Sequence, residues 1–404
     1  MVRDPRGRAY PRCAGFLAPA VPRKLRFVKR EQMRRTRRDI AEAAQEGRDW
    51  LRFAARVNDV VGAAVPFDRA CWHSVDPGTY LFTGLLGRNM ICSGSWLAEH
   101  EYIRTDVNKW VDLARSGQLA GALSAATRGD VTASARVRSS IELGMPVGDE
   151  LRVSFVADGT YWAAAGFLRD EGPGFDDGEV AFLAAVSPAI AEGFRRAILV
   201  SGIGQDTDDA VAPGVIVLDP HGHVESVSPQ AQHWIAGLTE DPPPRLAHEA
   251  RVVQAVAARA RHPGIAGSLA RARTQTRSGQ WLLLYGTPLA GQLDGRVAVI
   301  VQPAGPHDIA PLVAQAYGLS ARERDVTRLC FRGLTTKEIA AALHISPYTV
   351  QDHLKSIFGK TGTRSRAELV GQVFLEHYVP RLEDVSRLPS GWNAQAIDPP
   401  SDGL

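Results

Sequence analysis

Four polar side chains share one face of a short helix predicted over residues 347–359. Tyr348, Gln351, Asp352 and Lys355 follow the i, i+3, i+4, i+7 spacing that places side chains on the same side of a helix. Glutamine can bond to two atoms of adenine, aspartate can accept from the cytosine amino group, and lysine can reach guanine or a phosphate. The row therefore has the chemistry to contact base edges in the DNA major groove, although a solvated helix face could have the same composition.

Side chains on either side of this row could hold the phosphate backbone. Hydroxyl and basic groups near helix ends can meet phosphates together with the free backbone amides found there. The candidates are Thr335, Lys337, Thr349, Lys360, Arg364, Ser365 and Arg366.

The helices that must position these residues are marked by their starts. Ser320, Thr335 and Ser365 each precede a glutamate by three residues, which is the spacing of a capping box. Ser346 is followed by proline, which is well tolerated at the first position of a helix. Four helix starts between residues 320 and 365 indicate a compact helical bundle.

Apolar residues on these helices indicate how the bundle closes and which face stays free. The predicted core consists of Val326, Leu329, Cys330, Ile339, Leu343, Val350, Leu354 and Ile357. The helices predicted over 336–342 and 347–359 leave four residues between them. Two helices joined by a short turn, with a polar row exposed on the second, fit the helix-turn-helix arrangement.

The segment "LSARERDVTRLCFRGLTTKEIAAALHISPYTVQDHLKSIFGKTGTRSRAELV" resembles the LuxR-type helix-turn-helix domain of bacterial regulators. The resemblance implies an all-α four-helix domain over 317–378 whose third helix recognises double-stranded DNA as part of a homodimer. RNA polymerase is a further candidate partner. The implied dimer contact comes from the fourth helix, through Leu369, Val370, Val373 and Phe374. Gln351 stands where many members have Lys or Arg, and Thr361 and Thr363 replace the usual Leu and Val.

The chain before this module predicts two α+β domains. The first, over 40–200, begins with a helix over 40–62, continues with the β-hairpins "RACWHSVDP"/"TYLFTGLL" and "ELRVSFVAD"/"TYWAAAGFLRD", and ends with a helix over 176–197. A polar linker follows. The second domain, over 210–304, pairs "GVIVLD" with "HVESVS" and continues with a helix over 249–261 and three strand-like runs. Residues 305–316 form a connection, and residues 379–404 are expected to be a disordered tail.

Both upstream domains resemble modules known from sensory proteins. The stretch "VPFDRACWHSVDPGTYLFTG" is similar to a GAF domain, and "GVIVLDPHGHVESVSPQA" is similar to a PAS domain. The resemblances imply that the upstream region receives a small-molecule or protein signal of unknown identity. Neither a phosphoacceptor receiver domain nor a nucleotide-binding P-loop is found in the sequence.

Other residues could carry chemistry in the upstream domains. Six aromatic side chains could line a ligand pocket or simply form the core: Trp72, Tyr80, Phe82, Trp110, Tyr161 and Trp162. Cys71 with His73 could form a thiolate–imidazole pair or a heme site, although packing in the core is the better interpretation. The alternative function is a GAF-like thiol-dependent enzyme using Cys71 or Cys92, or a ligand-binding protein, localised by its helical module. No nucleophile, base and orienting group share a convincing spacing, so we expect no enzyme. His221 and His223 lack a third ligand, so neither a metal nor a cofactor is expected.

Composition places these domains in a soluble protein. The four cysteines are scattered without metal or disulfide spacing, and no apolar stretch is long enough to cross a membrane, which predicts a cytoplasmic protein. The net charge of +3 is unevenly distributed: residues 1–38 carry +11, which leaves −8 for the remaining chain. This basic segment is either a disordered arm that attracts polyanions or an extension upstream of a folded protein that starts near Met33.

Overall fold

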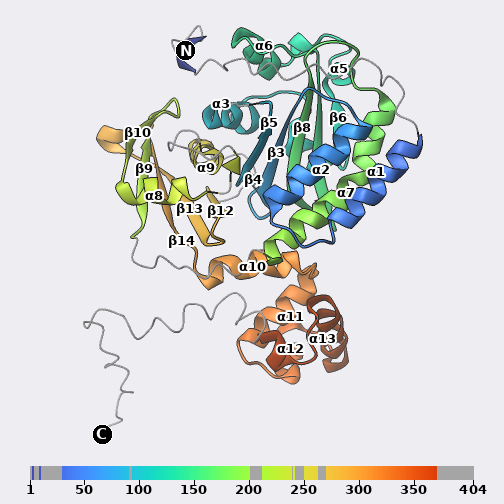
Figure 1. Cartoon of the computed structure of the whole chain (residues 1–404). Helices are drawn as coiled ribbons and strands as arrows, with labels where there is room; N and C mark the ends of the chain where they lie inside the picture. Colours follow the sequence, from blue (N-terminus) through green and yellow to red (C-terminus); the bar gives the residue numbers. More distant parts are fainter. Residues whose placement is uncertain are drawn as a thin grey trace. The chain divides into compact units, whose positions relative to one another are not determined.

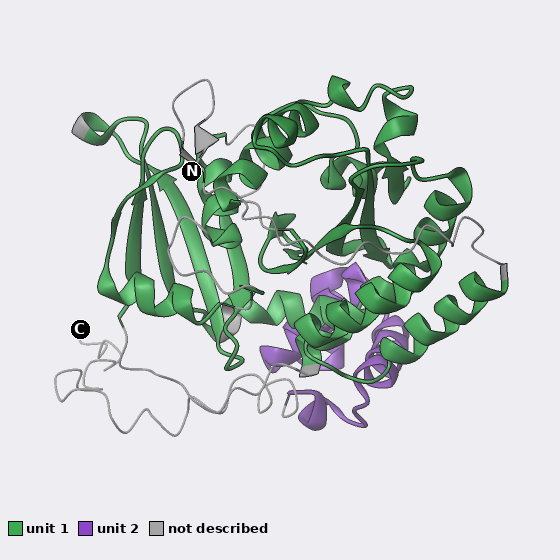
Figure 2. Ribbon diagram, turned by 45° about the horizontal axis from the view of Figure 1, so that its top comes forward, with its two compact units in different colours: residues 1–319 green, residues 320–404 purple. Residues whose placement is uncertain are grey.

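The computed structural model describes residues 2–3, 9–10, 30–90, 93–200, 212–238, 240–241, 250–262 and 270–370. It consists of two compact units, residues 1–319 and 320–404 (Figure 2). Unit 1 is a mixed α/β region, and unit 2 is helical. Among the described residues, no helix is long and apolar enough to cross a membrane. In the predicted basic arm, the structure describes the short pair β1 (Val2–Arg3) and β2 (Ala9–Tyr10), and residues 379–404 lie outside the described ranges.

The first sheet of unit 1 has the strand order β11-β5-β3-β8-β7-β6, with β4 paired to β3 (Figure 1). Its edge strand β11 (Glu240–Asp241) comes from the second half of unit 1. Its strands from the first half of the chain are β3 (Arg69–Asp76), β4 (Leu81–Phe82), β5 (Leu85–Arg88), β6 (Ala120–Ala122), β7 (Asp149–Ala157) and β8 (Thr160–Arg169). Both predicted hairpins are confirmed, because β3 pairs antiparallel with β4 and β5, and β7 with β8. Asp158 and Gly159 connect β7 and β8 with positive φ angles of 50° and 71°, as a tight two-residue turn requires.

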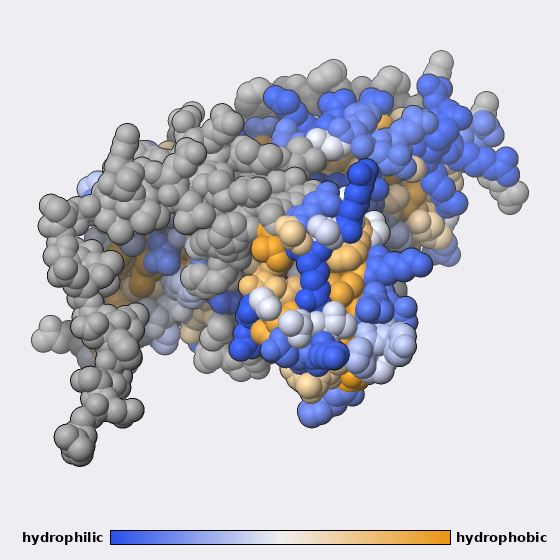
Figure 3. Space-filling view, turned by 90° about the horizontal axis from the view of Figure 1, so that it is seen from below, coloured by the Kyte–Doolittle hydropathy of each residue, from blue (hydrophilic) through white to orange (hydrophobic). Residues whose placement is uncertain are grey.

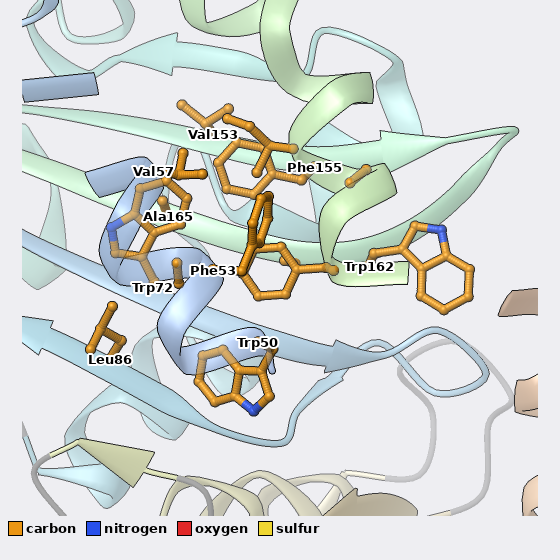
Figure 4. Packing of buried hydrophobic residues seen from close by; sticks show 14 of the residues in the cluster. Trp50, Phe53, Val57, Trp72, Leu86, Val153, Phe155, Trp162 and Ala165 are labelled. Atoms are coloured by element: carbon orange, nitrogen blue, oxygen red, sulfur yellow. The ribbon is translucent and has the colours of Figure 1, made fainter. Parts of the chain in front are cut away.

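Three long helices cover one face of this sheet: α1 (Arg30–Ala43), α2 (Trp50–Ala64) and α7 (Asp177–Val200). Aromatic rings fill the space between these helices and the sheet. They include the stacked pair Trp72 and Phe155, whose ring centroids are 5.3 Å apart (Figure 4). The helix predicted to start at Asp176 is confirmed as α7. The Asp176 carboxylate caps this helix by accepting from the Glu179 amide at 2.9 Å.

The start of the chain differs from the prediction in two ways. The single helix expected over 40–62 is two helices, because Gly47 takes a left-handed φ of 62° and Asp49 caps α2 through the Arg52 amide. Residues 30–38, assigned to a disordered arm, form the first turns of α1, where Thr36 and Ile40 are buried. Apolar periodicity runs through both helices, so it does not reveal the break between them.

The other face of the first sheet carries shorter elements. These are α3 (Gly94–Ala98), the π-helix η1 (Glu99–Ile103), α4 (Trp110–Ser116), α5 (Leu123–Ala126), η2 (Val131–Ala133) and α6 (Ala135–Glu142). α4 packs against β7, while α3 and η1 contact the helix α9 (Arg251–Arg261), which packs on the second sheet. Short helices therefore cover this face, and two of them connect it to the second half of unit 1.

The second sheet is antiparallel, with the order β10-β9-β14-β13-β12. Its elements and connections are β9 (Gly214–Leu218), β10 (Val224–Val227), α8 (Pro229–Ala236), β11 (Glu240–Asp241), α9 (Arg251–Arg261), β12 (Arg271–Gln275), β13 (Trp281–Pro288), η3 (Gly291–Leu293) and β14 (Val297–Pro303). The predicted hairpin at Gly222 and the later strands are confirmed. β11 instead joins the first sheet, where it pairs parallel with β5.

Helix α9 connects the two sheets of unit 1. Ten of its eleven residues are buried, because β13 and β14 cover one side and α3, η1 and β4 cover the other. Residues 306–316, expected to form a simple connection, are the helix α10 (Pro306–Ala316), and α10 packs against α7.

Unit 2 contains α11 (Ala321–Phe331), α12 (Thr336–Leu343), α13 (Pro347–Thr361) and the start of a fourth helix at residues 366–370. α11 and α12 both pack against α13. The predicted core residues are buried except for Leu343, which is half-buried.

Candidate nucleic-acid interface

Side-chain caps fix the four helices of unit 2 at the predicted residues. Ser320 and Thr335 each form a reciprocal capping box with the glutamate three residues later. Ser346 accepts from the Thr349 amide at 3.1 Å, and Ser365 accepts from the Glu368 amide at 3.0 Å. These bonds satisfy amides that a helix leaves free at its start.

The turn between α12 and α13 is short. Only His344, Ile345 and Ser346 separate the two helices, one residue fewer than predicted, because α12 continues to Leu343. His344 ends α12 in the left-handed region at φ 55°. Histidine is one of the few residue types besides glycine that adopt this conformation with some frequency.

The predicted base-contacting row lies on the exposed face of α13. Tyr348, Gln351, Asp352 and Lys355 are all exposed, and Tyr348 is 80% exposed, the highest value among the exposed large hydrophobic residues. The opposite face of the helix is fixed in the core through Val350, Leu354 and Ile357. A rigid helix thus presents four polar side chains in one direction.

The candidate phosphate contacts fall into two groups. Thr335, Lys337, Arg364 and Ser365 are exposed, whereas Thr349 is half-buried with its hydroxyl 2.9 Å from that of Ser346. Lys360 and Arg366, in contrast, bind other residues of unit 2.

Lys360 joins α13 to α11. Its ammonium lies 2.7 Å from Oε2 of Glu323, whose other oxygen accepts from the Ser356 hydroxyl at 2.6 Å. Burial acts to raise the pKa of Glu323, but hydrogen bonds from Lys360, Ser356 and Ser320 lower it to about 2. The sequence identified Glu323 as a capping residue and gave no signal for a partner 37 residues away.

Arg366 joins the fourth helix to α12. Its Nη1 donates to the Leu334 carbonyl at 2.8 Å, and its Nη2 lies 3.3 Å from the Thr336 hydroxyl. The guanidinium is half-buried, so it fixes the start of the fourth helix beside the start of α12.

A groove of about 530 Å³ runs beside the exposed row. Its lining residues are Thr336, Gln351, Leu354, Lys355, Phe358, Arg364 and Arg366. Three cations and an apolar floor thus meet in one depression. Sequence reasoning missed Phe358, whose half-buried ring lies one helical turn after Leu354. Seen from below, the protein surface shows hydrophilic side chains around a hydrophobic area (Figure 3).

The helical unit is similar to domains of known proteins. Residues 318–373 match the family of bacterial regulatory proteins named luxR. An HTH-type transcriptional regulator from Mycobacterium bovis is 47% identical over 60 residues, which are 15% of this chain and 7% of that protein. The probable transcriptional regulatory protein NarL from Mycobacterium tuberculosis is 30% identical over 205 residues, covering 46% of this chain and 88% of NarL. The chain belongs to the LuxR family of bacterial regulatory proteins.

Another relative aligns over a short stretch of the chain. The monoamine regulon transcriptional regulator of Klebsiella aerogenes is 40% identical over 57 residues, or 14% of this chain and 25% of that protein. Among solved structures, the phage VqmA–DPO complex has a TM-score of 0.22 at 18% identity, covering 41% of this chain and 83% of that one. The bacteriophytochrome RpBphP3 of R. palustris has a TM-score of 0.32 at 12% identity, covering 70% and 64%. Scores this low do not establish a shared overall fold.

The fourth helix of the LuxR-type module is described only at its start. Leu369 is completely buried inside unit 2, and Val370 is half-buried. Val373 and Phe374 lie outside the described residues. Of the described dimer candidates, only Val370 has surface available to a partner.

The aromatic residues predicted to line one pocket upstream of the LuxR-type module lie on both faces of the first sheet. Trp72 and Trp162 belong to the cluster under α1, α2 and α7. Phe82, Trp110 and Tyr161 belong to the opposite cluster, and Tyr80 packs against it. These residues therefore do not form a single pocket, and their places in or against two core clusters fit the other interpretation, that they are core residues.

A buried charge network occupies the second of these faces. Glu150 accepts from Arg136 at 2.7 Å and from Arg152 at 2.9 Å, and Arg152 also donates to Glu101 at 3.0 Å. The Arg152 guanidinium lies 3.7 Å above the Trp110 ring. Burial acts to raise the pKa of Glu150, but the two arginines lower it to about 2. A cavity of about 30 Å³ adjoins the network and also touches Cys71 and Trp96.

The other candidate chemical groups are histidines and cysteines, and the structure describes the surroundings of most of them. His73 is fully buried and stacked on Phe82 at 4.4 Å, and burial lowers its pKa to about 3, so it is neutral near pH 7. Cys71 is buried, and Cys92 lies outside the described residues. His223 bonds to Asp219 at 3.0 Å. Across the described ranges, no three His, Cys, Asp or Glu side chains are grouped to hold a metal ion.

Proposed function

We propose that this protein is a sequence-specific DNA-binding transcriptional regulator whose upstream unit senses a signal and controls the helix-turn-helix module. The observation that carries the proposal is the exposed row on α13, fixed from behind by the core and held across a three-residue turn from α12. Membership of the LuxR family supports it.

In this proposal, α13 enters the major groove and its exposed row contacts bases. Gln351 bonds to an adenine, Asp352 accepts from a cytosine amino group, and Lys355 reaches guanine or a phosphate. Tyr348 projects from the first turn of the helix, where its ring can contact a thymine methyl group or the backbone.

The candidate contacts to the DNA phosphate backbone differ in whether the side chain already binds other residues of unit 2. Lys337 and Arg364 have exposed side chains and neutralise phosphates directly. Thr335, Thr349 and Ser365 offer hydroxyls and helix-start amides. Lys360 and Arg366 act mainly by holding α13 and the fourth helix in place, because both are engaged within the unit.

The protein acts as a homodimer on a site with two half-sites about one DNA turn apart. The fourth helix supplies the contact through Val370 and through Val373 and Phe374 beyond the described residues. Leu369 supports that surface from inside the core.

The upstream region acts as the sensor. We assign residues 40–200 to a GAF-like domain and 210–304 to a PAS-like domain, with a basic arm over the residues before α1 (Arg30–Ala43), the helix-turn-helix domain over 317–378 and a tail over 379–404. The signal is a small molecule or a partner protein, and the site of action is the cytoplasm, where RNA polymerase is a further partner.

Selection from a random duplex library tests the proposal. The full-length protein should enrich a pseudo-palindromic sequence, and a variant carrying Gln351→Ala with Asp352→Ala should lose that enrichment while it still binds duplex DNA weakly at low salt. Binding of the unaltered protein without any enriched sequence would contradict a sequence-specific regulator.

A further inference from the structure

A buried ion pair links the two sheets of unit 1. Asp76, at the end of β3, is completely buried, and Arg273 on β12 is 6% exposed. The carboxylate accepts from Nη2 of Arg273 at 2.6 Å, from Nε at 2.9 Å and from the Arg273 amide at 2.9 Å. It also accepts from the Gly78 amide at 2.8 Å. Four donors thus hold a carboxylate of the first sheet, and three of them belong to one residue of the second.

The same arginine also reaches helix α10. Its remaining terminal nitrogen, Nη1, donates to the Asp308 carbonyl at 3.1 Å, in the first turn of α10. Arg273 therefore binds the first sheet, belongs to the second sheet and contacts the helix that leads to unit 2.

The other end of α10 is fixed to the first half of unit 1. Arg195 on α7 donates to the Ala316 carbonyl at 2.8 Å, and Ile309, Leu312 and Val313 are buried between these ends. Only four residues separate the end of α10 from the start of α11 in the LuxR-type module. Along the chain, α10 is therefore the last element of unit 1 before that module.

A buried ion pair is weak evidence for stability, because desolvation offsets much of its attraction. Its geometry is specific, however, since the arginine fork holds its partner in one orientation. A cavity of about 40 Å³ adjoins the pair and is lined in part by Asp76, Arg273 and Leu312. The junction is thus strongly directional without being completely filled.

We propose that Arg273 is a positioning residue that couples both sheets of the sensor to the DNA-binding module by fixing α10. The inference rests on the proposed function, because it states how the sensor controls the module. While the Asp76–Arg273 pair is intact, α10 holds the two modules of a dimer at a fixed separation. When a signal alters either sheet, the pair loosens and the modules bind independently.

Two substitutions perturb this junction by different routes. Arg273→Lys keeps the positive charge but loses the fork, so one ammonium cannot serve Asp76 and the Asp308 carbonyl together. Gly78→Ala leaves both partners intact but places a methyl group 2.8 Å from Nη2 of Arg273. The matched control is Glu225→Gln on β10, which removes the charge that Arg296, just before β14, contacts at 2.5 and 2.9 Å.

Hydrogen exchange of the full-length protein, followed by mass spectrometry, measures the first step. Amides of α10 should exchange about tenfold faster in both junction variants and at the original rate in the control, since one charge-assisted hydrogen bond is lost or strained. Unchanged exchange in α10 would overturn the inference, whatever the protein does with DNA.

Binding to the selected duplex measures the second step. The junction variants should bind a duplex with two half-sites about tenfold more weakly and bind a single half-site as the unaltered protein does, because loosened modules lose their effective concentration. Faster exchange with unchanged two-half-site affinity would overturn the coupling role. Failure of the proposed function would look different, because the unaltered protein would then prefer no sequence.

Discussion

Replacing Glu323 by glutamine should show how much the ion pair with Lys360 stabilises the fold of unit 2. The substitution preserves the shape of the side chain and removes the charge that holds Lys360 at 2.7 Å. The pKa of Glu323 is about 2 in the folded protein, against an ordinary 4.5. That difference sets an upper bound of about 3 kcal/mol on the contribution of the charge.

The expected loss is smaller than this bound. Glu323 is 6% exposed, but the Lys360 side chain is 39% exposed, so solvent screens part of the attraction. We expect Glu323→Gln to lower the free energy of unfolding of unit 2 by about 2 kcal/mol at pH 7. Hydrogen exchange of the most protected amides in α11 and α13 of the full-length protein measures this value.

The pH dependence follows from the direction of the shift. A carboxylate with a depressed pKa stabilises the fold fully above its unfolded pKa, and this stabilisation declines as the pH falls from about 4.5 toward about 2. The difference between the original protein and the variant should therefore be constant above pH 5 and shrink below it. Glu338→Gln, in the exposed capping box of α12, is the control and should cost less. A difference that does not change with pH, or equal losses in both variants, would refute the reasoning.

Three further outcomes are expected. Arg364→Ala should weaken binding to all duplexes and reduce the slope of log affinity against log salt by about one. Lys360→Ala should change that slope less, because Lys360 is paired with Glu323. Salt titrations of duplex binding measure both slopes. Gly193→Ala should destabilise unit 1 by about 1–3 kcal/mol in thermal unfolding, because the new methyl group would lie 2.0 Å from the Phe53 ring. In a thermal-shift screen of the full-length protein, a small molecule that binds unit 1 should raise its unfolding temperature, and a protein signal would leave every compound without effect.

Local features of the molecule were predictable from the sequence. The four helix caps of unit 2 and the turn at Asp158 and Gly159 depend on residues close together in the chain, so spacing alone indicates them. The exposed row on α13 follows from helical periodicity in the same way.

Contacts between distant segments were not predictable. The Asp76–Arg273 pair joins residues 197 positions apart, and the Lys360–Glu323 pair joins residues 37 apart. Nothing in the local composition selects one arginine or lysine among the 47 in the chain as the partner. These contacts matter for function, because a basic side chain that is paired inside the protein is less available to bind a ligand.

One of the two interpretations of the six aromatic residues, a pocket shared by all of them, could have been excluded from the sequence. Tyr161 and Trp162 are neighbours on β8, and neighbouring residues of a strand point to opposite faces of a sheet. They could not both line a pocket on one face, and the structure places them in separate clusters. Strand alternation was a stronger constraint here than the shared aromatic character of the six residues.

The most direct test of the central claim compares the unaltered protein with Gln351→Ala on a set of duplexes that carry every single base-pair change in the selected site. If α13 contacts bases through its exposed row, the two proteins should differ in preference at one base pair per half-site, by about 1–3 kcal/mol. An equal loss of affinity on every duplex would show that this side chain does not recognise sequence and would contradict the account.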